Sequence, residues 1–215
     1  MSISLKGLTI LLADDHAIVR MGFRLLLEGA GARVSAEAAS GEEAVRLYAE
    51  VQPDLLVMDV SMPGIGGLAA LERLRVRHPA ARVLILSAHH DAVIPARALK
   101  AGALGYLCKS CLPNEFLIAV RQVASDQRYI DPALAQELAL AQLGGCAHPA
   151  ESLTDKEFTV FLQLAQGSSV SEIARDFHVS ASTVGTHLYH IKQKLNLQNS
   201  AELAMLAVRS GLIET

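Results

Sequence analysis

Residues 54–64 read Asp54-Leu-Leu-Val-Met-Asp-Val-Ser-Met-Pro-Gly64, and this stretch decides the fold. Its apolar run, Asp54–Met58, shows no alternation of polar and apolar side chains. Such a run is typical of a strand that is buried on both faces of a parallel sheet. A carboxylate, Asp59, follows the run directly. Because open α/β sheets place their sites at the carboxyl ends of strands, Asp59 stands where chemistry is expected.

Similar apolar runs occur on both sides of this stretch and alternate with amphipathic helical patterns. The other runs are Leu8–Ala13, Arg33–Ala38, Val83–Ser87 and Tyr106–Cys108. The helical patterns cover residues 16–29, 41–51, 67–78, 91–101 and 114–125. Five strand–helix repeats predict a (βα)₅ doubly wound α/β domain over residues 1–125.

The rest of the chain changes character. Residues 126–150 hold one short helical pattern and then the Gly- and Pro-containing stretch GGCAHPA, which predicts a linker. Residues 151–215 are helical in period throughout and predict a small all-α domain of four helices. Two capping boxes start helices there, Thr154 with Glu157 and Ser169 with Glu172. Further starts are predicted at Ser180 and Ser200, and ends at Gly167 and Gly211.

The bulk composition excludes several classes of protein. The 215 residues are 51% hydrophobic and 19% charged with a net charge of −3, which argues against wholesale coating of nucleic acid. No run is long enough for a membrane span, and two Asp directly after the first apolar run argue against a signal peptide. Three cysteines, an odd number, suit a reducing compartment. We therefore expect a cytoplasmic protein with no membrane partner.

Polar side chains gather at the carboxyl ends of the predicted strands. They are Asp14, Asp15, Asp59, Ser87 and Lys109. Three carboxylates on one rim repel one another unless a cation neutralises them, and Mg²⁺ is the hard cation that prefers such oxygen ligands. Asp59 is then a candidate nucleophile toward a phosphoryl donor, with the lysine and the serine stabilising charge on the transferred group.

Four stretches, ADDH, MDVSMPGIGG, LSA and GYLCK, resemble the signature stretches of the receiver domains of two-component response regulators. The whole chain, with its linker and tail, resembles the NarL/FixJ family, in which a flavodoxin-like receiver precedes a LuxR-type helix-turn-helix domain. The resemblance implies that Asp59 accepts a phosphoryl group from a sensor histidine kinase. It also implies Mg²⁺ held by Asp14, Asp15, Asp59 and the Ser61 carbonyl, and a switch pair, Ser87 and Tyr106, beside Lys109. Catalysis would be limited to self-phosphorylation and slow self-dephosphorylation.

The stretch SVSEIARDFHVSASTVGTHLYHIKQKL, residues 169–195, predicts two helices joined by a short turn. In the second helix Val184, Leu188, Ile191 and Leu195 form an apolar stripe, which leaves a polar face. Such a face fits a recognition helix in the major groove, or equally the solvated side of a helical bundle. The module resembles the LuxR type, which implies that it binds promoter DNA and forms a homodimer after phosphorylation. A contact with RNA polymerase would be compatible with that role. The implied DNA-binding residues are Ser182, Thr183, Gly185, Thr186, His187, Tyr189, Lys192 and Lys194. The implied dimerisation residues are Ala204, Ala207 and Val208.

Several features keep alternatives open. From residue 147 on, the chain has seven acidic and five basic side chains, whereas modules that bind DNA are usually basic. Positions 182, 185 and 189, where members of the resembled family often carry Lys or Arg, hold Ser, Gly and Tyr. An output through protein–protein contact with weak or no DNA binding is therefore a second hypothesis. Cys108 and Cys111 bracket Lys109, which raises the alternative of redox control, although Cys108 ends an apolar run and is most simply a small buried apolar residue. A stand-alone enzyme is disfavoured because the first loop, ADDH, lacks the glycines of a phosphate cradle.

Overall fold

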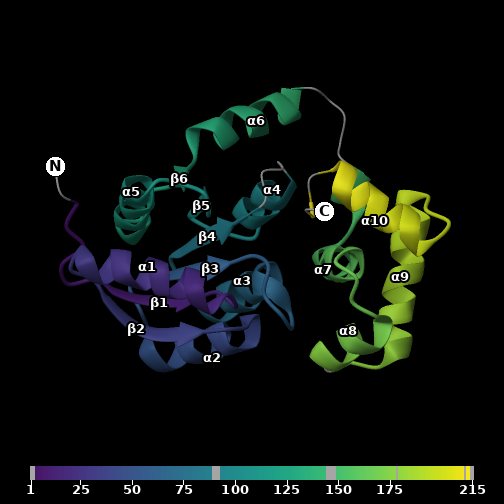
Figure 1. The fold of residues 1–215 in the computed structure, drawn as a ribbon, viewed down its shortest axis with the longest axis horizontal. Coiled ribbons are helices and arrows are strands. Elements are labelled where there is room, and N and C mark those ends of the chain that lie inside the picture. The colour runs from purple at the N-terminus through teal and green to yellow at the C-terminus, as the bar shows by residue number, and fades with distance from the viewer. Residues whose placement is uncertain (1–2, 89–92, 144–148, 178, 211, 214–215) are drawn as a thin grey trace. The chain divides into compact units, whose positions relative to one another are not determined.

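The computed structural model describes residues 3–88, 93–143, 149–177, 179–210 and 212–213. Its internal contacts divide the chain into two compact units, Met1–Ala88 with Arg97–Ala135, and His89–Ala96 with Gln136–Thr215. Strands and helices alternate along the first unit, and the second unit is helical (Figure 1). Among the described helices, none has the length and apolar character that a membrane span requires.

The first unit is built on one parallel sheet whose strands follow the order β2-β1-β3-β4-β5-β6. The strands are β1 (Thr9–Ala13), β2 (Arg33–Ala38), β3 (Leu55–Asp59), β4 (Val83–Ser87), β5 (Gly105–Cys108) and β6 (Tyr129–Ile130). From the neighbouring pair β1 and β3, the chain adds β2 on one side and β4, β5 and β6 on the other. The direction of winding therefore changes between β1 and β3. This is the doubly wound, flavodoxin-like sheet that the sequence predicted.

The strand register brings the polar rim together. Ala13 pairs with Met58, Asp59 with Leu86, and Ser87 with Cys108. The residues that end or follow β1, β3, β4 and β5 are therefore neighbours across the sheet. A shift of one residue in any of these pairings would move a polar side chain from this rim to the other face of the sheet.

Helices cover both faces of the sheet. They are α1 (Ala17–Gly29), α2 (Gly41–Val51), α3 (Gly66–Arg77), α4 (Val93–Lys100) and α5 (Pro113–Ala124). One core cluster joins α1 and α5 to the sheet, with Phe23 and Phe116 in ring contact at 4.6 Å between centroids. On the strands this cluster takes alternate residues such as Ile10 and Leu12, while α2 contacts α3 and the strands β1 and β2. The sheet is thus buried on both sides, which explains its continuous apolar runs.

The sequence missed the sixth strand. Tyr129–Ile130 lies within the stretch assigned to the linker, yet it pairs in parallel with Gly105 and Tyr106 of β5. Two residues are too few to show any period, so only their β-forming side chains signalled a strand. Because β6 covers the edge of β5, β5 is an internal strand and not an edge.

The helix α6 (Pro132–Leu143) begins at its proline and is followed by a short 3₁₀ helix, η1 (Pro149–Ser152). Four further helices complete the second unit: α7 (Asp155–Ala165), α8 (Val170–Asp176), α9 (Ala181–Leu195) and α10 (Ser200–Arg209). The helix α7 packs on α9 and α10, and α8 packs on α9. The predicted stripe of α9 is its inner face, since Val184 and Ile191 are completely buried and the other two members are half-buried.

Side-chain caps define the starts of these helices. Both predicted capping boxes form, and Ser180 accepts a hydrogen bond from the backbone N–H of Thr183. The predicted start at Ser200 is wrong, because the cap of α10 is Asn199, whose side chain accepts from the Glu202 N–H. Gly167 follows α7 with a φ of +96°, a conformation that favours glycine and ends a helix. The predicted stop at Gly211 lies outside the described residues.

Candidate functional site

A lysine joins two buried carboxylates at the carboxyl rim of the sheet. Asp14 follows β1, Asp59 ends β3 and Lys109 follows β5. The Lys109 Nζ lies 2.7 Å from Oδ2 of Asp14 and 2.7 Å from Oδ2 of Asp59. Both aspartate side chains are 1% exposed, and the lysine side chain is 14% exposed. The structure thus brings together three of the predicted site residues from three separate segments.

The charges at this rim are unbalanced. Burial raises the pKa of Asp59 to about 6, against the opposing effect of the Lys109 charge, and the Asp14 carboxylate adds to the rise. Burial by itself lowers the pKa of Lys109, but the Asp59 and Asp14 carboxylates outweigh burial and raise it. One ammonium therefore faces two buried carboxylates and stays charged. A site of this kind gains from an additional positive charge.

The loop after β3 is held close to Asp59. The Ser61 N–H donates to Asp59 Oδ1 at 3.1 Å, and the Gly67 N–H donates to the Val60 carbonyl at 2.8 Å. A Cβ on Gly67 would lie only 2.1 Å from the Asp59 carbonyl oxygen, so no larger residue fits there without moving the loop. The structure therefore assigns Ser61 a backbone bond to Asp59. The predicted role of its carbonyl as a metal ligand stays a prediction.

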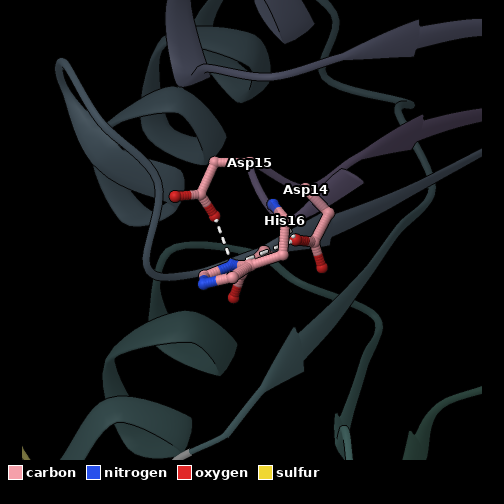
Figure 2. Close-up of side chains that lie close together, drawn as sticks. Asp14, Asp15 and His16 are labelled. Atoms are coloured by element: carbon pink, nitrogen blue, oxygen red, sulfur yellow. Dashed lines mark hydrogen bonds and ion pairs between the residues drawn. The ribbon is translucent and has the colours of Figure 1, made fainter. Parts of the chain in front are cut away.

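Asp15 and His16 complete the acidic end of the rim. The His16 Nδ1 lies 2.8 Å from Asp15 Oδ1 and 3.5 Å from Asp14 Oδ1 (Figure 2). One ligand atom from each of Asp14, Asp15, His16 and Asp59 lies within 4.8 Å of all the others. Three carboxylates beside one lysine leave excess negative charge, so the donor set fits a divalent cation. The sequence pattern pointed to the aspartates but not to His16, although its position directly after them was a signal.

Ser87 and Tyr106 are both fully buried beside this rim. Ser87 ends β4, and its carbonyl accepts from the Lys109 N–H at 2.7 Å. Tyr106 pairs with Ile85 of β4 on one side and with Ile130 of β6 on the other. Tyr106 is therefore a fully buried side chain on an internal strand.

The two cysteines that flank Lys109 are half-buried. Burial, together with the charge of Glu115, raises the pKa of the Cys111 thiol to about 11. The Cys108 Sγ lies 3.0 Å from the Ser110 hydroxyl. Because the thiolate is the reactive form, the raised pKa argues against a redox role for Cys111.

The helix α9 carries most of the predicted DNA-binding residues on its outer side. Tyr189 is 60% exposed, Ser182, Thr183 and Thr186 are exposed, and Gly185, His187 and Lys192 are half-buried. Two of the hydroxyls already have local partners, since that of Thr186 donates to the Ser182 carbonyl and that of Thr183 contacts the Ser180 hydroxyl. These bonds are short-range and leave the side chains on the surface.

Lys194 forms an ion pair within the second unit that the sequence did not predict. Its Nζ donates to Glu157 Oε2 at 2.6 Å, and the glutamate side chain is only 5% exposed. Glu157 also accepts from the Thr154 backbone N–H and hydroxyl, and its pKa is lowered because these bonds outweigh burial. Lys194 therefore anchors α9 to the start of α7, which explains its position without DNA.

The predicted dimerisation residues on α10 fall into two groups. Val208 is 38% exposed and Ala204 is half-buried, so both have surface to offer to a partner. Ala207 is completely buried and has none, so its assignment to a dimer surface is wrong. Small size suited Ala207 to close packing inside the unit, where α10 contacts α7.

Comparison with protein-family models gives two matches. Residues 10–121 match the response regulator receiver domain, and residues 151–207 match the bacterial regulatory proteins of the luxR family. The chain is 38% identical over 208 residues to the response regulator UvrY of Escherichia coli K12, covering 95% of both chains. It is 42% identical over 209 residues to the transcriptional activator protein ExaE of Pseudomonas putida, covering 95% of this chain and 97% of that one.

Solved structures give the same result for the fold. A LuxR-family two-component response regulator from Aurantimonas sp. SI85-9A1 superposes with a TM-score of 0.61 and 42% identity, over 63% of this chain and 98% of that one. RcsB from Salmonella enterica serovar Typhimurium, bound to a promoter in the presence of a phosphomimetic, superposes with a TM-score of 0.72. It covers 94% of this chain and 98% of that one, and at 22% identity it supports the fold alone.

Proposed function

This chain belongs to the response regulators that carry a receiver domain and a LuxR-type DNA-binding domain, and from that premise we propose that Asp59 is the phosphoacceptor of the receiver. The observation that carries this proposal is the placement of Asp59. It ends the central strand β3, is 1% exposed, and lies 2.7 Å from the Lys109 ammonium. Burial raises the pKa of the Asp59 carboxyl to about 6.

The donor is the phosphohistidine of a sensor histidine kinase, which is the partner that a receiver domain implies. An Asp59 carboxylate oxygen attacks phosphorus, the new O–P bond forms, and the N–P bond of the donor breaks. The leaving imidazole nitrogen keeps the electron pair and takes up a proton. Lys109 stabilises the negative charge of the transferred oxygens, because its ammonium already faces Asp59 and stays protonated.

The acidic cluster fits Mg²⁺, which would be held by Asp14, Asp15 and Asp59, with the Ser61 carbonyl as the further ligand implied by the family. Mg²⁺ supplies positive charge that offsets repulsion between the carboxylates and the transferred group. In this chain Asp14 has an additional task, since its Oδ1 accepts from the His16 N–H and its Oδ2 contacts Lys109. Asp14 therefore positions the start of α1 and the lysine together.

Ser87 and Tyr106 are proposed to carry the signal from the site. The Lys109 side chain contacts Asp59, and its backbone N–H is bonded to the Ser87 carbonyl. A phosphoryl group on Asp59 draws the ammonium and the serine hydroxyl toward its oxygens, and these movements reach β4 and β5 directly. Tyr106 lies on β5 two residues before Cys108, the partner of Ser87, and is proposed to adjust to the space that Ser87 leaves.

The proposed output is binding of promoter DNA by a homodimer, with α9 in the major groove. Contacts with RNA polymerase would be compatible with this transcriptional role. Ser182, Thr183, Gly185, Thr186, His187 and Tyr189 would face the bases, with Lys192 on a phosphate. Because Lys194 is bonded to Glu157 and the unit is acidic, we propose weak binding by a single unit that becomes useful in a dimer. A protein–protein output is the second candidate, favoured by the same ion pair.

The test is fluorescence anisotropy of a fragmented genomic DNA pool with Mg²⁺, before and after addition of beryllofluoride. We expect beryllofluoride to increase binding in the wild type and to have no effect in Asp59→Asn. An Asp54→Asn variant, which changes an aspartate at the other end of β3, should still respond. DNA binding that beryllofluoride does not change would refute control by phosphorylation. Dimerisation without DNA binding would favour the protein–protein output.

A further inference from the structure

The cation site at the rim has a nitrogen ligand as well as oxygens. The His16 Nδ1 belongs to the same group of ligand atoms as Asp14, Asp15 and Asp59, all within 4.8 Å of one another. Figure 2 shows the imidazole ring turned toward the two neighbouring carboxylates, with ion pairs to both. We propose that His16 makes this a site for a first-row transition ion, such as Mn²⁺ or Co²⁺, and that His16 is its selectivity-determining ligand. The inference rests on the proposed function only in using the same metal site.

The spacing of the atoms suits octahedral coordination. Neighbouring ligands of an octahedral ion with bonds of about 2.1 Å are separated by about 3 Å. The His16 Nδ1 lies 2.8 Å from Asp15 Oδ1 and 3.5 Å from Asp14 Oδ1, which brackets that edge. An ion could therefore take one atom from each of the three side chains after small rotations.

Hydrogen bonds at both sides of His16 fix the main chain that carries the ring. The His16 N–H donates to Asp14 Oδ1 at 2.8 Å, and the His16 carbonyl accepts from the Arg20 N–H at the start of α1. His16 is the residue before the first turn of α1, so its backbone is fixed at both sides. Its side chain is 64% exposed, which leaves the ring open to an ion from solvent. The ligand is therefore positioned before any ion arrives.

The chemistry of the donor atoms decides for which ion His16 raises the affinity of the site. Imidazole nitrogen is a poor ligand for Mg²⁺, which selects carboxylate, carbonyl and water, but a good one for first-row transition ions. Any site of nitrogen and oxygen ligands binds Co²⁺ more tightly than Mn²⁺, so raw affinity alone does not identify the histidine. The informative quantity is the change in each affinity when only His16 is altered.

The experiment measures binding of Mg²⁺ and of Co²⁺ to the full chain by isothermal titration calorimetry, using protein without a polyhistidine tag. His16→Gln should lower the affinity for Co²⁺ about tenfold or more, a loss typical of a disturbed metal environment, and leave that for Mg²⁺ unchanged. His78→Gln, a histidine that instead contacts the Tyr48 ring at 5.1 Å, should change neither. Pulsed electron paramagnetic resonance of bound Mn²⁺ should show a nitrogen coupling that disappears in His16→Gln alone.

Equal losses for both ions, no loss for Co²⁺, or no nitrogen coupling in the wild type would each overturn the proposal. The outcomes also separate it from the proposed function. If Mg²⁺ binds and requires Asp14 but His16 is without effect, only the selectivity inference fails. If neither ion binds to the wild type, the metal site of the proposed function fails with it.

Discussion

Replacing Asp59 with asparagine should stabilise the first unit when divalent cations are removed. The pKa of Asp59 is raised from 3.8 to about 6 by burial, so folding disfavours the ionised carboxylate. The folded state therefore binds the proton more tightly than the unfolded chain. The contribution of Asp59 to the free energy of unfolding is highest below its ordinary pKa, and it falls as the pH rises to about 6.

The size of the effect follows from the same shift. One pKa unit corresponds to about 1.4 kcal/mol, so the rise from 3.8 to about 6 gives a penalty of about 3 kcal/mol at neutral pH. Asparagine keeps the shape without the charge, but it weakens the bond from Lys109, which retains its contact with Asp14. We therefore expect Asp59→Asn to raise the free energy of unfolding by about 1 to 3 kcal/mol.

The assay is urea unfolding at neutral pH in EDTA, followed by pulsed hydrogen exchange and mass spectrometry. Peptides of the first unit are then read separately from those of the second, which two-unit unfolding requires. Added Mg²⁺ should remove most of the difference, because a bound cation stabilises the wild type by mass action.

The matched control is Asp54→Asn. Asp54 accepts from the Thr9 N–H at 2.8 Å and from the Thr9 hydroxyl at 2.7 Å, and these bonds lower its pKa. Its charge therefore stabilises the fold, and the same substitution should lower the free energy of unfolding by about 1 kcal/mol. A loss of stability in Asp59→Asn in EDTA, or a gain that Mg²⁺ leaves unchanged, would refute the reasoning.

Two pairs of substitutions and one labelling experiment test the site and the second unit. Lys194→Met should lower the free energy of unfolding of the second unit by about 1 kcal/mol, a value reduced because the ion pair is partly exposed. Lys192→Met should weaken DNA binding without destabilising the fold. Urea unfolding and fluorescence anisotropy of both variants test this, and the opposite assignment of the two effects would contradict it. Gly67→Ala should disrupt the loop beside Asp59 and abolish the response to beryllofluoride, because its Cβ would lie 2.1 Å from a carbonyl oxygen. Gly22→Ala lies in the middle of α1, where an added Cβ would have no atom within 4 Å, and should instead stabilise the first unit by about 1 kcal/mol. Equal shifts of the melting temperature in Gly67→Ala and Gly22→Ala would contradict this difference. The Cys111 thiol should react slowly with iodoacetamide at neutral pH because its pKa is raised to about 11, and rapid labelling of the native chain would reopen the redox hypothesis.

Periodic features were predictable, and single contacts were not. The run Val83–Ser87 is a strand with the predicted bounds, because burial on both faces demands an unbroken apolar run. Arg33–Ala38 also keeps its predicted bounds, although it lies at the end of the strand order and only its Ala38 is buried. Asp14, Asp59 and Lys109 were found because strand ends share a rim, whatever the details of packing. The strand Tyr129–Ile130 was missed because it exists only through its pairing with β5.

Two features of the second unit, the cap of α10 and the ion pair of Lys194, were missed for different reasons. The cap of α10 was readable in the sequence, because Asn199 stands three residues before Glu202, the spacing of the two capping boxes that were recognised. The partner of Lys194 was not readable, because Glu157 is 37 residues away and the pair forms only when α9 packs on α7. A lysine near the end of a polar helix suggests a phosphate contact until its tertiary partner is known.

That ion pair limits how the second unit can bind DNA. The lysines of α9 are Lys192 and Lys194, and the ammonium of Lys194 already neutralises a carboxylate that is 5% exposed. Moving it to a phosphate would leave the Glu157 carboxylate without its lysine, at a cost of about 1 kcal/mol. Phosphate contacts by one unit therefore depend on few positive charges, so the counterions released when one unit binds DNA are also few. A second copy doubles that number without any change in α9, so we expect dimerisation to be the step through which phosphorylation would most raise the affinity for DNA.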